Sequence, residues 1–426
     1  MDFVLEKSAL NGEVRIPGSK SHTIRAVAIA ALAEGTSHIL SPLDSADAHA
    51  ARRVYRQFGA CIDELDAEWR VQGFGGSPGT PADIIDVRNS GTTMRMALGS
   101  AALMPGGGLA VLTGDDQVRR RPCGPLAAAL NTLGAKVEST LGTGNPPFVV
   151  RGRMRGGEVT LEAVTSQYVS SLLVNAPLAE GDTVLHVPLL NEKPYVVMTL
   201  DWLSRQGVRV EYDSELSEFR IPGGQRYQPV DRPIPSDFSS ATFFLAAGAL
   251  PGNRVGSLGL DMTDTQGDKA VVDYLRAMNV SVEVDGDAVR VTGGSLRGCE
   301  IDMNATPDAL PMMAALACFA EGTTRLVNVP QARLKETDRI HVMRLELEKM
   351  GGRVTELPDG MIIEQSVLHG AEVDGHGDHR VIMALSIAAT QVAGVTKVHG
   401  ADAVDVTYPG FGDALRQLGG SLKAEI

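Results

Sequence analysis

The sequence predicts an α/β protein of two lobes, each built from three repeated strand–helix units with buried helices. Three observations lead to this prediction: a helix-closing residue that recurs six times, six apolar helices in phase with it, and a proline-rich segment between repeats three and four. The length of 426 residues agrees, because a single hydrophobic core rarely extends over so long a chain.

The first observation is a helix-like segment that ends in Gly or Asn and leads into a strand-like run. The intervals between the closing residues are 75, 73, 72, 72 and 68 residues. Gly and Asn tolerate the left-handed conformation that often closes a helix, and the following residues alternate as in a half-buried strand. The six closing residues are Gly59, Gly134, Gly207, Asn279, Gly351 and Gly419.

The second observation is a set of apolar, Ala-rich helical segments. They begin near Ser21, Gly91, Ser166, Asp237, Asp308 and Asp378. Because these segments are apolar on most faces, each helix should be buried. The two markers together predict a unit of strand, helix, strand, helix and strand. A solenoid or a propeller also repeats at a fixed period, but a propeller blade would consist of strands alone.

The third observation concerns the joints between the lobes. The segment QPVDRPIPSD contains three prolines between the third and fourth repeats, and Pro17-Gly18 precedes the first helix. Such segments are typical of linkers. We therefore expect one lobe over residues 16–232 and a second over residues 1–15 plus 233–426, joined by two hinge strands.

Composition narrows the classes of function. The chain has 39 Lys and Arg against 52 Asp and Glu, and a net charge of −13 argues against nonspecific binding to nucleic acid or to anionic membranes. The first residues lack a signal pattern, no long apolar span occurs, and the four cysteines form no CxxC pair. We expect a cytoplasmic monomer without disulfides or a zinc site.

Charged and hydroxyl side chains cluster where the repeated helices begin. A helix N-terminus favours anions, because its first N–H groups are unpaired and its dipole is positive there. Each cluster also has a plain alternative interpretation as an N-cap, a basic turn or a solvated helix face. The clusters are GSKS with HTIR at residues 18–25, RNSGTTMR at 88–95, RRRPC at 119–123, TSQY at 165–168, ARLKETDR at 332–339 and DHR at 378–380.

The KETDR run is the most specific of these clusters. Lys335 and Arg339 are four residues apart, so on a helix their like charges would share one face and repel. An anion between them would remove the repulsion. Because the clusters recur at equivalent points of the repeat, folding should gather them on one side of each lobe. Two facing lobes would then form a cationic cleft for small anionic substrates.

Taken in order, GSKS…R, NSGTTMR, RRRP, SQY, KPY, PDA, KETDR and DHR resemble 5-enolpyruvylshikimate-3-phosphate synthase over residues 12–410. The resemblance implies two pseudo-threefold lobes with inward helices, an inside-out barrel, connected by two crossovers. It implies transfer of the enolpyruvyl group of phosphoenolpyruvate to the 5-hydroxyl of shikimate 3-phosphate, with release of phosphate, on the route to chorismate and aromatic amino acids. Neither a metal nor an organic cofactor is implied.

The same resemblance assigns roles to individual residues. Asp308 is implied as the base at the 5-hydroxyl and Glu336 as the acid or base at the methylene carbon, with Lys20 and His379 as secondary candidates. Residues implied to bind shikimate 3-phosphate are Lys20, Ser21, Arg25, Thr165, Ser166, Gln167, Tyr195, Asp308, Gln331 and Lys335. Residues implied to bind phosphoenolpyruvate are Lys20, Asn89, Gly91, Arg121, Gln167, Arg339 and Arg380.

The chain departs from the family pattern at four positions. Val406 stands where many members carry Lys, while Gln331 replaces Asn and Thr165 replaces Ser with little chemical change. Glu192 in NEKPY replaces a Ser that contacts the substrate phosphate in many members. A carboxylate repels a phosphate, so we expect Glu192 to turn away or to pair with Lys193 or an Arg.

Three alternatives remain open at this stage. A related enzyme transfers enolpyruvyl to UDP-N-acetylglucosamine, but there we expect Lys-Asn in place of Lys20-Ser21 and a Cys at the position of Asp116. A different shikimate-like or chorismate-like acceptor would explain Glu192. The third alternative is a catalytically inactive binding protein on the same repeats. Against it stand five retained residues: Lys20, Asp308, Glu336, Arg339 and Arg380.

Overall fold

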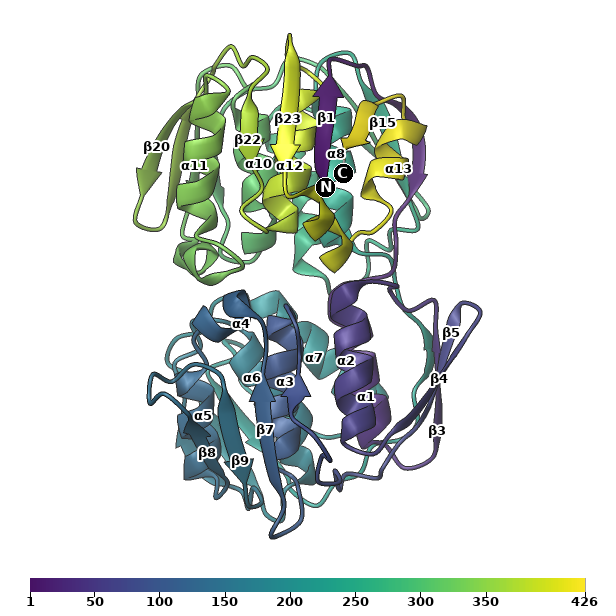
Figure 1. The fold of residues 1–426 in the computed structure, drawn as a ribbon, viewed down its shortest axis with the longest axis vertical. Helices are drawn as coiled ribbons and strands as arrows, with labels where there is room; N and C mark the ends of the chain where they lie inside the picture. The colour runs from purple at the N-terminus through teal and green to yellow at the C-terminus, as the bar shows by residue number, and fades with distance from the viewer. Residues whose placement is uncertain (426) are drawn as a thin grey trace. The chain divides into compact units, whose positions relative to one another are not determined.

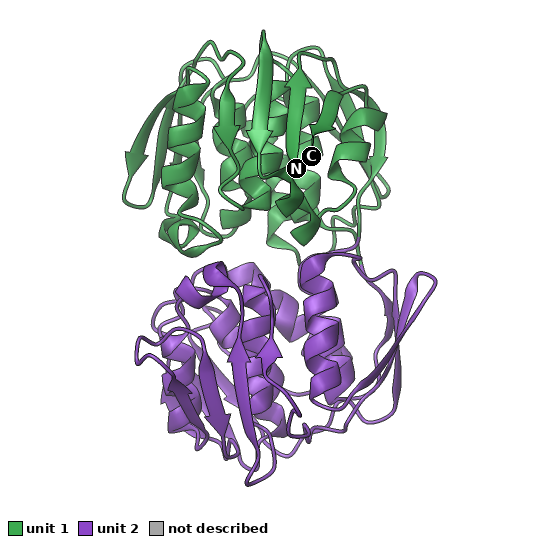
Figure 2. Ribbon diagram, viewed as in Figure 1, with its two compact units in different colours: residues 1–17, 235–426 green, residues 18–234 purple. Residues whose placement is uncertain are grey.

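The six expected repeats appear as six four-stranded β-sheets in the computed structural model, which describes residues 1–425 (Figure 1). The chain divides into two compact units, and each unit contains three of these sheets and its own hydrophobic core (Figure 2). Unit 2 consists of residues 18–234, and unit 1 consists of residues 1–17 and 235–426. Among the described residues, no helix has the length and apolar character needed to cross a membrane.

Unit 2 contains the first three repeats. Its helices are α1 (Lys20–Leu32), α2 (Ala46–Gln57), α3 (Gly91–Ala101), α4 (Asp116–Arg120), α5 (Gly124–Thr132), α6 (Gln167–Asn175), the 3-10 turn η1 (Ala176–Leu178) and α7 (Lys193–Arg205). Its strands are β3 (Thr36–Leu40), β4 (Cys61–Leu65), β5 (Glu68–Gln72), β6 (Ile85–Asp86), β7 (Leu109–Thr113), β8 (Lys136–Ser139), β9 (Phe148–Arg151), β10 (Gly157–Thr160), β11 (Thr183–His186), β12 (Glu211–Tyr212), β13 (Glu218–Ile221) and β14 (Asp231–Pro233).

Unit 1 contains the last three repeats. Its helices are α8 (Phe238–Ala249), η2 (Gly267–Ala270), α9 (Val271–Ala277), η3 (Pro307–Ala309), α10 (Leu310–Ala317), η4 (Pro330–Leu334), α11 (Arg339–Lys349), α12 (His379–Ala389), η5 (Ala401–Val406) and α13 (Phe411–Gln417). Its strands are β1 (Asp2–Glu6), β2 (Asn11–Arg15), β15 (Arg254–Leu258), β16 (Ser281–Asp285), β17 (Ala288–Thr292), β18 (Glu300–Asp302), β19 (Thr323–Val327), β20 (Arg353–Leu357), β21 (Gly360–Glu364), β22 (Glu372–Asp374), β23 (Val395–His399) and β24 (Ser421–Glu425).

The predicted helix-closing residues are confirmed. Each lies two residues after the last residue of α2, α5, α7, α9, α11 or α13, and a strand follows it. All six have a positive φ, from 67° at Asn279 to 110° at Gly59. Gly and Asn adopt such values more readily than other residues, because a larger side chain clashes with the backbone there.

The repeat contains one more strand than the sequence predicted. In the second repeat, β6 pairs parallel with β7, β7 pairs antiparallel with β9, and β9 pairs antiparallel with β8. The predicted strand after each closing residue is therefore the first arm of a hairpin. The alternating pattern predicts a single strand there, because the tight turn between the two arms does not interrupt the alternation. In the first repeat this turn passes through Ala67, whose φ is 54°.

The six apolar helices are buried, as predicted. Every residue of α8 and of α12 is buried, and in unit 2 α3 packs against both α1 and α6. In unit 1, α10 packs against α12, and α12 also contacts strands β1 and β23 of the sheet outside it (Figure 1). The sheets therefore surround the helices in each unit, which is the pseudo-threefold arrangement expected.

Strands from outside the local repeat complete three of the sheets. β14, within the proline-rich segment, pairs parallel with β3 and completes the first sheet of unit 2. In unit 1, β2 pairs parallel with β15, and β1 lies between β23 and β24. The chain crosses from one unit to the other after Pro17 and after Ile234, directly beyond β2 and β14.

Candidate active site

The first charged cluster lies at the start of α1. Lys20 is the first helical residue, and its Nζ lies 3.4 Å from Oδ2 of Asp47 in α2. Arg25 lies one turn further on, and its Nη1 donates to the backbone oxygen of Ser21 at 3.0 Å. The predicted four-residue spacing therefore does place Ser21 and Arg25 on one face.

Arg25 connects three helices of unit 2. Its Nε donates to Oγ1 of Thr199 in α7 at 2.9 Å, and its Nη2 donates to Oγ of Ser170 in α6 at 3.2 Å. The same Nη2 donates to the backbone oxygen of Tyr195 at 3.1 Å. The side chain is only 1% exposed, and this burial lowers the pKa of Arg25 to about 10. The guanidinium is still charged at neutral pH.

Gly91, the first residue of α3, lies against two guanidinium groups. A Cβ placed on Gly91 would be 2.6 Å from Nη1 of Arg121 and 2.8 Å from Nη1 of Arg95. Arg95 donates to Oε1 of Gln167 at 2.9 Å and to the backbone oxygen of Pro122 at 3.1 Å. The clusters at residues 88–95, 119–123 and 165–168 thus meet at the start of α3.

Asn89 has a different environment. Its Nδ2 donates to Oδ2 of Asp115 at 2.7 Å and to Oε1 of Gln117 at 2.6 Å. Asp115 is the N-cap of the short helix α4 and accepts from the backbone N–H of Val118. Both hydrogens of the Asn89 amide are therefore engaged in holding the loop before the RRRP segment.

Glu192 turns toward the hydroxyl cluster at the start of α6. Its Oε2 accepts from Oγ of Ser166 at 2.8 Å, from the backbone N–H of Ser166 at 3.1 Å and from Oγ1 of Thr165 at 3.1 Å. Glu192 therefore does not turn away from this cluster, and Lys193 pairs with Glu215 and not with Glu192. The alternative of an Arg partner for Glu192 stays a prediction. The hydroxyls and the helix N-terminus stabilise the buried carboxylate instead.

Plain N-capping does not explain Ser166 either. Ser166 is the residue before α6, but its side chain makes no capping hydrogen bond and donates to Glu192.

In unit 1, three carboxylates surround Arg339 at the start of α11. Its Nε donates to Oδ2 of Asp378 at 2.8 Å, its Nη1 to Oδ1 of Asp308 at 2.7 Å, and its Nη2 to Oε2 of Glu336 at 2.6 Å. Burial alone lowers the pKa of the Arg339 guanidinium, but the three carboxylates, Asp378 foremost, raise it above its ordinary value.

Asp308 contacts two further cations. Its Oδ2 lies 3.1 Å from Nη2 of Arg380 at the start of α12, and its Oδ1 lies 3.8 Å from Nζ of Lys335. The cluster therefore joins three carboxylates to three cations around the starts of η3, α11 and α12. His379 is the first residue of α12 and is fully buried beside Arg380.

The interpretation of the KETDR run as one helical face is wrong. Lys335 follows the 3-10 turn η4, and α11 begins only at Arg339, with Asp338 as its N-cap. Lys335 and Arg339 instead converge on the carboxylate of Asp308, so a carboxylate of the protein separates their charges. Gln331 lies in η4, and its Nε2 donates to the backbone oxygen of Asn304 at 2.9 Å.

The predicted site residues thus form two separate groups, one in each unit. Sequence reasoning assigned no role to Asp47, Arg95 or Asp378, which hold Lys20, Gln167 and Arg339. Arg95 and Asp378 lie within motifs that the sequence analysis singled out. The sequence carries no local signal for Asp47, because it contacts Lys20 only through the packing of α2 on α1.

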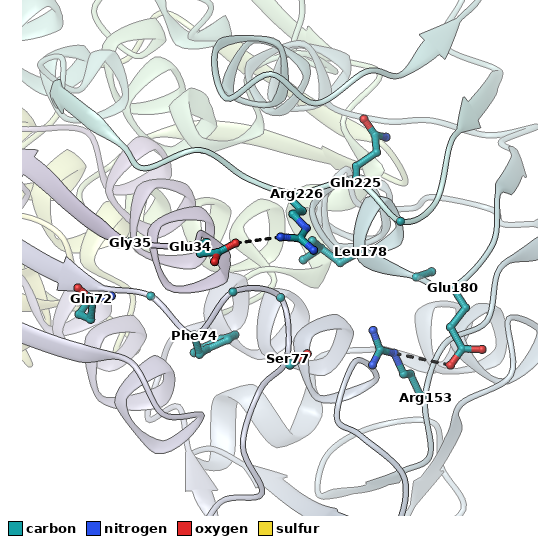
Figure 3. A pocket seen from close by; sticks show the side chains of 15 residues that line it. Glu34, Gly35, Gln72, Phe74, Ser77, Arg153, Leu178, Glu180, Gln225 and Arg226 are labelled. Carbon is teal, nitrogen blue, oxygen red and sulfur yellow. Dashed lines mark hydrogen bonds and ion pairs between the residues drawn. The ribbon is translucent and has the colours of Figure 1, made fainter.

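A cavity of about 630 Å³ in unit 2 lies at the other end of α1 and α6 (Figure 3). Its lining combines residues that follow these helices with loop residues that follow strands. Ion pairs join Arg226 to Glu34 at 3.2 Å and Arg153 to Glu180 at 4.0 Å. The described lining residues include none of the predicted site residues. This cavity is therefore separate from the candidate active site that the charged clusters at the helix starts form in unit 2.

Comparisons with known proteins identify the family of the chain. Residues 4–415 match the family model of EPSP synthase (3-phosphoshikimate 1-carboxyvinyltransferase). The chain is 52% identical over 418 residues to the 3-phosphoshikimate 1-carboxyvinyltransferase of Acetivibrio thermocellus, covering 98% of each chain. It is 50% identical over 423 residues to the protein of the same name from Ruminiclostridium cellulolyticum, covering 99% of this chain and 100% of the relative.

A solved structure shows the same fold. The EPSP synthase of Acinetobacter baumannii has a TM-score of 0.83 and 27% identity to this chain, and the match covers 100% of both chains. The chain belongs to the EPSP synthase (3-phosphoshikimate 1-carboxyvinyltransferase) family.

Proposed function

We propose that this chain transfers the enolpyruvyl group of phosphoenolpyruvate to the 5-hydroxyl of shikimate 3-phosphate and releases phosphate, as a step of aromatic amino acid biosynthesis. The observation that carries this function is the identity of 52%, over 98% of the chain, to a relative named for that reaction. The ordered motifs at the helix starts also support it.

We assign the binding of anionic substrate groups mainly to unit 2. Arg25, Arg95 and Arg121 place guanidinium groups near the first turns of α1 and α3, where the helix dipoles also favour anions. The proposed ligands of shikimate 3-phosphate here are Lys20, Ser21, Arg25, Thr165, Ser166, Gln167 and Tyr195, and those of phosphoenolpyruvate are Lys20, Asn89, Gly91, Arg121 and Gln167.

Unit 1 supplies the proton-transfer groups in this proposal. Asp308 accepts the proton of the 5-hydroxyl, and Glu336 donates a proton to the methylene carbon. In the structure Arg339 holds both carboxylates. The positive charge of Arg339 disfavours protonation of both carboxylates. An anionic group of phosphoenolpyruvate therefore has to take the place of the Asp308 carboxylate at Arg339 or at Arg380. Gln331 and Lys335 would complete the binding of shikimate 3-phosphate, and His379 would support the position of Arg380.

The reaction then proceeds by addition and elimination. Protonation of the methylene carbon makes the adjacent carbon electrophilic, and the 5-hydroxyl oxygen attacks it while Asp308 takes the hydroxyl proton. The resulting tetrahedral intermediate loses phosphate, and the Glu336 carboxylate takes back a proton from the methyl group, which restores the double bond as a vinyl ether. The nearby cations stabilise the phosphate as it leaves.

Release of inorganic phosphate tests the function. We expect release from phosphoenolpyruvate only when shikimate 3-phosphate is present, together with a product whose mass corresponds to the vinyl ether. Shikimate without its phosphate and UDP-N-acetylglucosamine are the acceptor controls. Faster release with either control acceptor, or none with shikimate 3-phosphate, would contradict the proposal.

We also propose that the protein is a cytoplasmic monomer in which units 1 and 2 act as the two functional domains. Light scattering of the purified protein should give a mass near 45.0 kDa. A mass of twice that value would contradict the monomer.

A further inference from the structure

Glu192 occupies a position that other features mark as an anion site. Its carboxylate is only 1% exposed and accepts three hydrogen bonds through one oxygen, two from Ser166 and one from Thr165. Glu192 is the N-cap of α7, but its side chain makes no capping bond to that helix. The carboxylate is thus directed at the start of α6, not at the helix that its own backbone begins.

The backbone of Glu192 is held in an unusual conformation. Its φ is 58° and its ψ is 41°, in the left-handed region that a side chain disfavours. A residue other than Gly or Asn stays there only when its surroundings hold it. Here the three hydrogen bonds to the carboxylate hold it, together with the bond from the Tyr195 N–H to the backbone oxygen of Glu192.

The donors that hold Glu192 are those that a phosphate would use. Two hydroxyls and a backbone N–H at a helix N-terminus form a set of donors suited to phosphate oxygens. Thr165 and Ser166 are also the residues assigned above to the phosphate-bearing substrate. A carboxylate and a phosphate cannot accept from Ser166 Oγ at once, because the hydroxyl has one proton and the two anions repel.

We propose that Glu192 is an internal competitor of the substrate phosphate, which has to displace its carboxylate from Thr165 and Ser166. This inference rests on the proposed function, since it takes shikimate 3-phosphate as the ligand. Glu192 lowers the affinity for the phosphorylated acceptor and leaves that for the unphosphorylated acceptor unchanged. It also keeps the hydroxyl cluster satisfied while the site is empty.

Two variants test the competition by calorimetric titration with shikimate 3-phosphate. Glu192→Gly removes the carboxylate and tolerates the positive φ, whereas Glu192→Gln keeps the size of the side chain without its charge. We expect the Gly variant to bind at least about tenfold more tightly than the wild type, since the substrate phosphate no longer has to break at least one hydrogen bond to a charged carboxylate. The Gln variant should fall between the two.

Two controls separate this effect from a general change of charge or fold. Glu215→Gln makes the same change of charge at an exposed side chain that pairs with Lys193, the neighbour of Glu192, and should leave the affinity unchanged. Titration with unphosphorylated shikimate should give the same affinity for the wild type and both Glu192 variants. Unchanged or weaker binding of shikimate 3-phosphate by the folded Gly variant would overturn the inference.

A structure of the wild-type protein with shikimate 3-phosphate gives a second test that needs no variant. We expect the carboxylate of Glu192 to lie beyond hydrogen-bond distance of Ser166 Oγ, with phosphate oxygens in its place. A carboxylate still bonded to Ser166 in the complex would overturn the inference even if both variants failed to fold. If the carboxylate stays bonded to Ser166 and the wild-type protein turns over normally, the inference fails but the proposed function stands. A wild-type protein without binding or turnover would refute both.

Discussion

Arg25 in unit 2 and Arg339 in unit 1 are both near the start of a helix and are both only 1% exposed, yet their surroundings differ. Arg25 donates to hydroxyl and backbone oxygens, and burial lowers its pKa to about 10. Arg339 donates to three carboxylates, which raise its pKa although burial opposes them.

The difference indicates what each unit can do. A guanidinium among neutral oxygens keeps a positive charge that can attract an anionic ligand. A guanidinium among carboxylates instead fixes the position of those carboxylates and offsets their charge. This difference supports our proposal that unit 2 binds the anionic groups of the substrates and that unit 1 holds the acid and the base.

The largest expected effect concerns the carboxylates of unit 1. Asp308→Asn and Glu336→Gln keep size but remove proton transfer, so each should lower turnover by ~10²–10⁴-fold while the substrates still bind. Turnover and substrate affinity measured on the same preparations check this. Asp413→Asn, at an exposed side chain, is the matched control and should keep full activity. Near-normal turnover in both variants would remove the proton-transfer role from unit 1.

The next effect concerns stability. Arg339→Leu would leave the buried carboxylates of Asp378, Asp308 and Glu336 without their shared partner and should lower the free energy of unfolding by ~3–5 kcal/mol. Urea denaturation measures this. Arg353→Leu, which removes an exposed ion pair to Glu364, should cost at most ~1 kcal/mol. Equal costs for the two variants would show that the carboxylate cluster is not a stabilising feature.

Arg25→Leu should have a smaller effect on stability and a specific effect on binding. The groups left behind are the neutral oxygens of Thr199, Ser170 and Tyr195, so the cost in unfolding free energy should be ~1–3 kcal/mol. Affinity for shikimate 3-phosphate should fall at the same time. Arg205→Leu, on the exposed end of α7, controls for the change of charge. A loss of turnover without a loss of affinity would reverse the roles that we assign to the two units.

The smallest effect concerns Gly91. A Cβ in Gly91→Ala would displace the Nη1 atoms of Arg121 and Arg95, which are the ends of flexible side chains. Stability should change little, whereas affinity for phosphoenolpyruvate should fall by about tenfold, as expected for the loss of about one charged hydrogen bond. Fluorescence or calorimetric titration measures it. Gly106→Ala, where nothing lies within 4 Å of the added atom, should bind as the wild type does. Unchanged affinity in Gly91→Ala would show that the guanidinium positions do not matter.

The sequence by itself determined the features that depend on short stretches of chain. Gly59 and Asn279 marked helix ends because left-handed conformations select these residues locally. The apolar segment of α8 identified a buried helix, since burial on every face requires an apolar side chain at nearly every position. The motifs at the helix starts identified the family for the same reason, because each motif is contiguous.

Only the tertiary structure decided which side chains meet. Arg95 and Gln167 are 72 residues apart, and no local pattern indicates that the packing of α3 on α6 joins them. Lys335 and Arg339 are close in sequence, but Asp308 lies in η3, and only the packing of η3 against η4 brings its carboxylate to both cations. Glu192 points to Ser166 because its buried carboxylate requires donors, and α6 presents them at its start. These choices depend on the desolvation of charges, which is set only when distant segments pack together.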